Sequence, residues 1–269
     1  MGKNGWRERI ERAKTLAEQY SFAEEVLRFY IRVAEFQADL YLRMEKSSSG
    51  ENYKNFVAPV SGPPELSELI AGFVPFLSVV EKNGPKNLAA AASELKAGSS
   101  ELHQEFLNDF WNTSTQVDAT PSQNFLARAF LQPYAEFTRD RSEARWEGYT
   151  GFTCPFCGRK PGVGVLRPLG DGGQRSLLCS FCLAEWTFRR IVCANCGEED
   201  HKRLPVYSAA QFEHVRVECC DRCKRYLKTV DLTKTGLANP VVDELASIPL
   251  DLWARERGYE KVELNIMQL

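Results

Sequence analysis

The sequence predicts an α+β protein with an N-terminal all-α domain, two small tandem metal modules and a short C-terminal helix. Apolar residues recur with helical spacing through residues 1–145. Eight of the nine cysteines then form four C-x-x-C pairs within residues 154–223. Composition changes sharply at Gly148-Tyr149-Thr150-Gly151. We therefore expect a helical domain at residues 1–147, metal modules at 148–191 and 192–236, and a C-terminal helix and tail at 237–269.

The longest predicted helix covers residues 22–46. Its apolar residues recur every three or four positions, as on a helix that buries one face. They are Phe22, Val26, Phe29, Tyr30, Val33, Phe36, Leu40 and Tyr41. Ser21 is a candidate N-cap, because Glu24 three residues later would complete a capping box.

Further helices are predicted at residues 65–81, 86–95, 99–111 and 121–141, with breaks at residues 47–50 and 59–64. Pro133 lies inside the last of them and is expected to kink or divide it. A C-terminal helix is predicted at residues 241–257, ending at Gly258. We expect the helical domain to dock a partner or to support the metal modules.

The four C-x-x-C pairs are the strongest chemical signal in the chain. They are Cys154/Cys157, Cys179/Cys182, Cys193/Cys196 and Cys220/Cys223. Two cysteines three positions apart in a tight turn can direct both sulfurs to one point, which is half of a tetrahedral thiolate site. Four such turns, called knuckles below, therefore predict two bound metal ions.

The knuckles form an internal repeat, with an offset of 39 positions from Cys154 to Cys193. Gly158 and Gly197 follow the first knuckle of each half, as suits a turn with positive φ. Each half has the order knuckle, hairpin, knuckle and strand, which is typical of a rubredoxin-like or zinc-ribbon module. The simplest ligand sets are Cys154, Cys157, Cys179 and Cys182, and Cys193, Cys196, Cys220 and Cys223. Interleaved pairing would need longer chain excursions.

The identity of the metal stays open at this point. Four thiolates suit zinc and mononuclear iron alike, and a [4Fe–4S] cluster also takes four cysteines. A coordinatively complete site in a module of about 40 residues usually replaces a missing hydrophobic core. Redox-active iron is the next interpretation, and thiol–disulfide chemistry is the least favoured of the three.

Three further residues near the knuckles have less certain roles. Cys219 adjoins Cys220 and is expected to be a spare thiol on the other side of a strand, although exchange with Cys220 or a reactive role is an alternative. His201 and His214 lie within the second module and could replace a cysteine ligand. With four cysteines for each site, we expect that they do not.

Composition and charge narrow the class of protein. The 269 residues are 43% apolar and carry a formal net charge of −2, so no general attraction to nucleic acid or anionic membrane is expected. Residues 69–80, the longest apolar stretch, are too short to cross a bilayer. The N-terminal residues show no apolar signal region. We therefore expect a soluble cytoplasmic protein with reduced cysteines.

Nucleic-acid binding, a common function of zinc ribbons, is not favoured. Residues 154–228 contain 13 Lys and Arg against 8 Asp and Glu, an excess of five. Two divalent ions in four-thiolate sites would carry about −2 each and cancel most of that excess. The remaining basic residues are dispersed, so the electrostatic footprint is weak.

No catalytic motif is present in the sequence. It contains no Walker loop, no Gly-x-Gly-x-x-Gly fingerprint and no Gly-x-Ser-x-Gly elbow. We expect a protein that is not an enzyme.

The knuckles and their surroundings resemble one known family, the formate dehydrogenase accessory protein FdhE. The resemblance rests on Cys154-Pro155-Phe156-Cys157-Gly158, on Leu178-Cys179-Ser180-Phe181-Cys182 with Glu185-Trp186, on residues 190–196 and on Cys220-Asp221-Arg222-Cys223 with Tyr226-Leu227-Lys228. The stretch Asp243-Glu244-Leu245-Ala246-Ser247-Ile248-Pro249-Leu250-Asp251 followed by Gly258-Tyr259 is also similar. The resemblance as a whole covers residues 150–265 well. The helical half matches mainly in length, although residues 125–128 and 132–134 are similar.

The resemblance implies a cytoplasmic accessory protein needed for active respiratory formate dehydrogenase. Such a protein would contact the catalytic subunit of formate dehydrogenase and bind two metal ions, with iron favoured over zinc, through the eight paired cysteines. It implies no catalytic residue. No membrane insertion is expected, and the sequence leaves self-association open. Two alternatives are a rubredoxin-like redox or oxygen-sensing protein and, less favoured, a nucleic-acid-binding zinc-ribbon protein.

Overall fold

The N-terminal part of the chain is helical. The structure, a computed structural model, describes residues 2–47, 69–112 and 119–269. Its helices here are α1 (Gly2–Gln19), α2 (Glu24–Ser47), α4 (Phe73–Asn83), α5 (Lys86–Lys96), α6 (Ser100–Asn112) and α7 (Pro121–Arg141). Two 3-10 turns, η1 (Ser21–Ala23) and η2 (Ile70–Gly72), precede α2 and α4.

These helices follow the predicted periodicity with differences at their ends. The helix α2 begins at Glu24, after η1, so Ser21 is not its N-cap. The start of the helix predicted at residues 65–81 and the breaks at 48–50 and 59–64 lie outside the described residues. The helix α1 was not singled out from the sequence, although Ala13, Leu16 and Tyr20 recur with helical spacing and are buried.

Helix α7 crosses the middle of the molecule and buries most of its length. Thr120 caps it in a capping box with Gln123. The helix is not divided at Pro133, contrary to one of the predicted outcomes. Pro133 has no N–H for the carbonyl of Ala129, and the side chain of Gln37 in α2 donates to that carbonyl instead, at 2.6 Å. A neighbouring helix thus satisfies the group that proline leaves free.

The C-terminal part forms one sheet of seven strands. The strands are β1 (Pro161–Leu169), β2 (Gly172–Cys179), β3 (Glu185–Thr187), β4 (Val206–Ser208), β5 (Val215–Cys220), β6 (Arg225–Asp231) and β7 (Glu260–Lys261). Their order is β3-β2-β1-β6-β5-β4, and β7 pairs with β6. Each predicted module therefore supplies three consecutive strands to a common sheet.

The two halves meet where β1 and β6 pair in parallel. Gly164 pairs with Thr229, and a Cβ at position 164 would collide with the Thr229 side chain. Glycine suits this point because the Thr229 side chain occupies the space that a Cβ would take. The cysteine spacing predicts two separate modules, whereas the sheet joins them edge to edge.

The C-terminal helix predicted at residues 241–257 is divided in two. Helix α8 (Pro240–Ala246) and helix α9 (Ile248–Glu256) are separated at Ser247. Pro249 explains the break, because it has no N–H to donate to the carbonyl of Leu245 four residues earlier and its ring would clash with that carbonyl in a continuous helix. Gly258 follows α9 with φ +78°, as expected of a helix stop.

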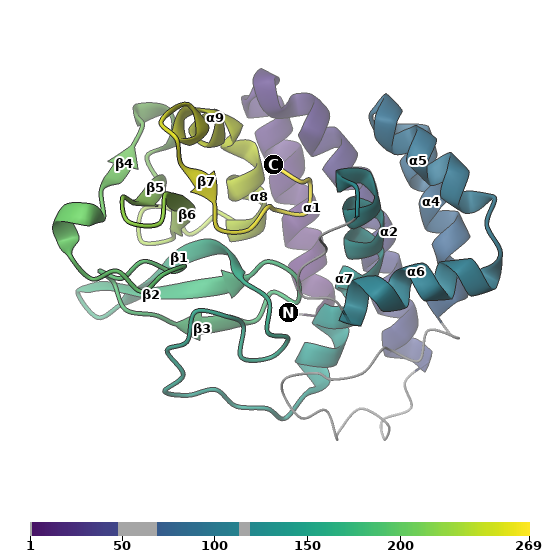
Figure 1. Cartoon of the computed structure of the whole chain (residues 1–269), viewed down its shortest axis with the longest axis horizontal. Coiled ribbons are helices and arrows are strands. Elements are labelled where there is room, and N and C mark those ends of the chain that lie inside the picture. The colour runs from purple at the N-terminus through teal and green to yellow at the C-terminus, as the bar shows by residue number, and fades with distance from the viewer. Residues whose placement is uncertain (1, 48–68, 113–118) are drawn as a thin grey trace.

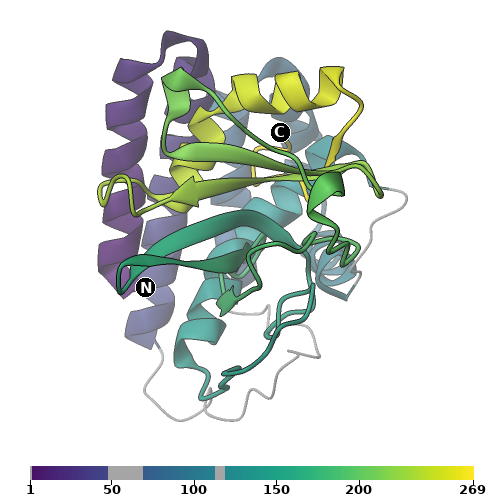
Figure 2. The same ribbon diagram turned by 90° about the vertical axis from the view of Figure 1, so that its left-hand side faces the viewer.

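The helices lie on one side of the molecule and the sheet on the other, with α8 and α9 packed above β5 and β6 (Figures 1 and 2). One apolar core runs from the helical part into the sheet and includes Phe110, Leu126 and Phe181. The predicted boundaries at residues 147, 191 and 236 fall between elements. Among the described residues, no helix is both long and apolar enough to cross a membrane.

Candidate metal centres

The first candidate centre contains Cys154, Cys157, Cys179 and Cys182, whose sulfur atoms all lie within 4.8 Å of one another. The Sγ atoms of Cys154 and Cys182 are 3.5 Å apart, and those of Cys157 and Cys179 are 3.4 Å apart. Four sulfurs bound tetrahedrally at zinc-to-sulfur distances of about 2.3 Å would be about 3.8 Å apart. The geometry therefore fits a tetrahedral metal ion with small adjustments.

The second candidate centre contains Cys193, Cys196, Cys220 and Cys223, again within 4.8 Å of one another. The Sγ atoms of Cys193 and Cys223 are 3.7 Å apart, and those of Cys196 and Cys220 are 3.6 Å apart. Cys196 and Cys223 are half-buried here, whereas in the first centre only Cys157 is. The structure thus gathers the cysteines in the two sets expected from the spacing, and the second set is nearer to solvent.

The backbone of each knuckle is shaped to hold its sulfurs. Gly158, Leu183, Gly197 and Lys224 each lie four residues after the first cysteine of a knuckle, and all have positive φ. In the first knuckle, the amides of Phe156 and Cys157 donate to the Cys154 sulfur at 3.4 Å. In the third, the amides of Asn195 and Cys196 donate to the Cys193 sulfur at 3.4 and 3.5 Å. Such bonds stabilise a thiolate over a thiol.

The burial and hydrogen bonds of the first centre favour a cation between its sulfurs. Burial raises the pKa of Cys154 and of Cys182 far above the ordinary value of a thiol. Burial also opposes ionisation of Cys179, but hydrogen bonds from the three neighbouring thiols lower its pKa well below that value. Four thiolates together require a positive ion between them.

Helix α7 binds the second knuckle of the first centre directly. Three side chains on one face of the helix donate to the carbonyl groups of three consecutive knuckle residues. Arg128 donates to Ser180 at 2.7 Å, Gln132 to Phe181 at 3.2 Å and Arg139 to Cys182 at 2.6 Å. These contacts, called the α7 clamp below, fix the turn that carries two of the four sulfurs. Sequence reasoning missed them, although polar Arg128 and Gln132 are spaced by four within an apolar stretch.

Aromatic rings and a further arginine surround the same knuckle. The Phe181 ring contacts those of Phe110 and Trp111 at centroid distances of 5.7 and 5.8 Å. The Arg159 guanidinium lies over the rings of Phe110 and Phe181, at 4.4 and 4.7 Å. A divalent ion with four thiolates has a charge of about −2. The guanidinium groups of Arg128, Arg139 and Arg159 are placed to balance it.

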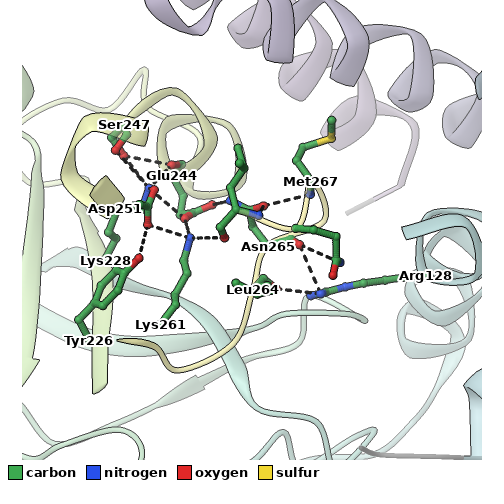
Figure 3. A network of polar contacts seen from close by, with 12 residues as sticks. Arg128, Tyr226, Lys228, Glu244, Ser247, Asp251, Lys261, Leu264, Asn265 and Met267 are labelled. Carbon is green, nitrogen blue, oxygen red and sulfur yellow. Dashed lines mark hydrogen bonds and ion pairs between the residues drawn. The ribbon is translucent and has the colours of Figure 1, made fainter. Parts of the chain in front are cut away.

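A buried polar network connects the α7 clamp to the second half of the sheet (Figure 3). Arg128 also donates to the carbonyls of Leu264 and Asn265, and Asn265 donates to Glu244 at 2.9 Å. Glu244 contacts Lys228 and Lys261, both fully buried.

Lys228 continues the network toward the second centre. It donates to Asp251 at 2.6 Å and to the Glu244 and Ser247 carbonyls between α8 and α9. Tyr226, three residues after Cys223, donates to Asp251 at 2.7 Å. The network thus extends from the Ser180 carbonyl beside the first centre to β6, the strand that follows the last knuckle of the second centre.

The other candidate ligands lie outside both centres. Cys219 belongs to neither group of four sulfurs, since neighbouring side chains of β5 point to opposite faces. Burial raises the pKa of Cys219 to about 12. His214 is hydrogen-bonded to Asp243 at 2.7 Å, and His201 is exposed. The structure brings neither histidine into a group of sulfurs.

The chain is thus a helical protein that carries two four-cysteine centres on one sheet of zinc-ribbon type. Residues 153–190 match the family model described as the FdhE central domain, and residues 191–268 match that of the FdhE C-terminal domain. The chain belongs to the FdhE family.

Curated relatives extend the likeness into the helical part. A protein FdhE homolog of Aquifex aeolicus is 28% identical over 267 residues, which cover 96% of this chain and 93% of that protein. A homolog from Pseudomonas aeruginosa is 30% identical over 76% of this chain and 66% of its own length. One from Haemophilus influenzae is 30% identical over 75% of this chain, and the match spans only 61% of that relative. The crystal structure of the FdhE protein from Pseudomonas aeruginosa superposes with a TM-score of 0.70 at 23% identity, over 100% of this chain and 97% of that one.

Proposed function

We propose that this protein is a cytoplasmic, non-catalytic accessory factor in the maturation of respiratory formate dehydrogenase. In this role it docks the catalytic subunit of that enzyme and holds two metal ions through its eight paired cysteines. The observation that carries the proposal is the α7 clamp in a chain of the FdhE family. The clamp makes the first four-cysteine centre part of the helical domain.

The metal sites are supported by the sulfur geometry and by the charge around it. Each group of thiols is close to the dimensions of a tetrahedral site, and amide donors and guanidinium groups surround the first centre. The ligands do not decide the metal, because four thiolates accept both iron and zinc. The family resemblance favours iron. Bound iron would supply one-electron chemistry.

Metal analysis of protein purified without oxygen tests this part. Two irons per chain and a thiolate-to-iron absorption band that bleaches on reduction are expected. Cys154→Ser should remove the metal of the first centre and Cys193→Ser that of the second, whereas Cys219→Ser should leave both. Full metal content in the first two variants would refute the ligand assignment.

Co-purification tests the docking part. A tagged protein expressed in cells that make formate dehydrogenase should retain the catalytic subunit under anaerobic conditions. Repeated failure to recover that subunit at native expression levels would reject the docking role. Recovery with the Cys154→Ser variant at the wild-type level would show that the first centre is not needed for docking.

A rubredoxin-like redox or oxygen-sensing role is a second candidate. The half-buried sulfurs of Cys196 and Cys223 favour it, because electron transfer and oxygen both require access to the centre. A colourless protein that contains only zinc after anaerobic preparation would exclude this role and the assignment of iron, and would leave the docking role in place.

A further inference from the structure

The two halves of the sheet are structural repeats, residue by residue. In the first half, Gly164–Leu166 of β1 pair with the residues two, three and four positions before Cys179. In the second half, Val206–Ser208 of β4 pair with the residues two, three and four positions before Cys220. Strand β4 is therefore the counterpart of the segment 164–166 of β1.

The segment 164–166 uses its outer edge to bind another strand. Gly164, Val165 and Leu166 pair in parallel with Thr229, Val230 and Asp231 of β6. The amide of Leu232 donates to the Leu166 carbonyl at 2.9 Å. The first half of the molecule thus shows what this edge can hold: a parallel strand in contact over three residues.

In the second half, the described residues place no strand on the same edge. Strand β4 lies at the end of the sheet, and all three of its residues are exposed. The amides of Cys219 and Asp221 donate to the carbonyls of Pro205 and Arg203, so residues 203 and 205 face β5. Because backbone groups alternate along a strand, Val206 and Ser208 direct theirs outward.

The opposite end of the sheet is covered by the chain itself. The indole N–H of Trp146 donates to the outward carbonyl of Glu185 in β3, at 2.8 Å. A second copy of this protein could continue the sheet by pairing its own β3 with β4. Trp146 occupies the outer edge of β3 and prevents this pairing. Because Trp146 covers β3, the open edge of β4 cannot be filled by β3 of a second copy.

A cavity of about 470 Å³ lies beside β4 and the second centre. Ile191 and Val206 line it and are 61% and 56% exposed, which is unusual for large apolar side chains that share one cavity. Four arginines, Arg175, Arg190, Arg216 and Arg225, line it with one carboxylate, that of Glu218, among the described residues. Arg190 is exposed and has no ion pair within the described part of the chain.

We propose that the outer edge of β4 accepts an extended segment of a partner polypeptide as a parallel strand. One apolar side chain of that segment would enter the cavity over Ile191 and Val206, and adjacent acidic side chains would face Arg190. Main-chain bonds supply affinity in such complexes, and the pockets beside the edge supply specificity. The identification of the partner as the catalytic subunit of formate dehydrogenase rests on the proposed function.

Hydrogen exchange of the full chain with and without the purified catalytic subunit tests the edge directly. The amides of Val206 and Ser208 should become protected in the complex, and the outer edge of β3 should not change. Val206→Pro removes an outward donor without removing a bond to β5, and should weaken binding about fivefold or more. Thr187→Pro is the matched control, since it makes the same change on the outer edge of β3.

A second pair of variants avoids any change to the backbone. Ile191→Glu should weaken binding about tenfold by losing apolar contact and repelling acidic residues. Leu237→Glu, at a residue that is 83% exposed and outside the cavity, should leave binding unchanged. If the subunit binds all four variants equally and exchange at Val206 and Ser208 is unchanged, the edge proposal is wrong and the docking function stands. If the subunit does not bind the wild-type protein, both proposals fail.

Discussion

The side chain of Gln37 in α2 compensates for a proline, Pro133, inside the neighbouring helix α7. Pro133 leaves the carbonyl of Ala129 without its helical donor, and this carbonyl is deep in the core between α2 and α7. The amide of Gln37 supplies the missing bond at 2.6 Å. A buried carbonyl without a partner destabilises a protein by about 1–3 kcal/mol.

We therefore expect Gln37→Leu to lower the free energy of unfolding by about 1–3 kcal/mol. Pro133→Ala in the same chain should restore part of this loss, because alanine at 133 has an N–H that can donate to Ala129. Urea denaturation of the two single variants and the double variant measures the coupling. Strictly additive losses would show that Gln37 does not act through this carbonyl.

Asp251 is the acidic residue whose ionisation is most closely tied to the buried network. Burial raises the pKa of its carboxyl, but the charges of Lys228 and Lys261 and a hydrogen bond from Lys228 outweigh burial, so the pKa lies below the ordinary value. A carboxyl with a lowered pKa in the folded state releases its proton more readily there than in the unfolded chain. Its stabilising effect is complete above the unfolded pKa of about 3.9 and disappears as pH falls through the lower folded value.

The pH dependence of unfolding tests this sign. Between about pH 5 and pH 3, the wild-type protein should lose more stability than Asp251→Asn, measured by denaturation of metal-bound samples of both proteins. Asp171→Asn, in the β1–β2 turn, is the control for a change of net charge. An equal slope in the wild-type and Asp251→Asn proteins would contradict the assignment.

Helix α7 is the element through which the helical domain acts on a metal centre. Its clamp fixes the backbone carbonyls of Cys182 and of the two residues between Cys179 and Cys182. Groups that orient metal ligands from outside typically change affinity by about 10- to 100-fold when they are removed. The effect should be confined to the first centre, because α7 bonds only that knuckle among those described.

Arg139→Leu should therefore lower the zinc affinity of the first centre by about tenfold. The measurement is chelator competition in a Cys193→Ser background, where the second centre is disabled. Arg141→Leu, two residues further along the same helix and stacked on Phe137, is the control. Unchanged affinity in Arg139→Leu would mean that the clamp serves packing alone.

Elements with a strong local pattern could be predicted from the sequence. The apolar spacing of α2 and the four C-x-x-C turns depend on neighbours within a few positions, so their signal is in the local sequence. The pairing of β1 with β6 depends on Gly164 meeting Thr229, which are 65 positions apart, and a single glycine in a strand does not reveal its partner. The same holds for the α7 clamp, whose acceptors are backbone carbonyls and carry no sequence signature.

At the scale of the whole molecule, the buried network and the continuous core join the helices, the sheet and the C-terminal segment. Each half of the sheet has about 40 residues, a size that usually needs a metal to fold. The part of this core around Leu27, Phe73 and Phe130 lies among the helices and contains no metal ligand. The two parts should therefore respond differently to loss of metal.

Removal of metal by a chelator should abolish hydrogen-exchange protection in β1 to β6 while α2 and α4 stay protected. The Cys219→Ser protein, treated in the same way, should behave like the wild type. Retention of protection in both halves of the sheet after complete metal removal would show that the apolar core alone maintains them.

Arg12 of α1 and Asp243 of α8 form a bidentate ion pair at 2.9 and 2.5 Å across 231 positions of the chain. On the ribosome, α1 emerges before the knuckles, and Asp243 emerges after all eight paired cysteines. Helix α1 therefore has no ion-pair partner for Arg12 in α8 until all four knuckles have left the exit tunnel. The closing of this contact marks the moment at which a newly made chain has had every metal ligand available.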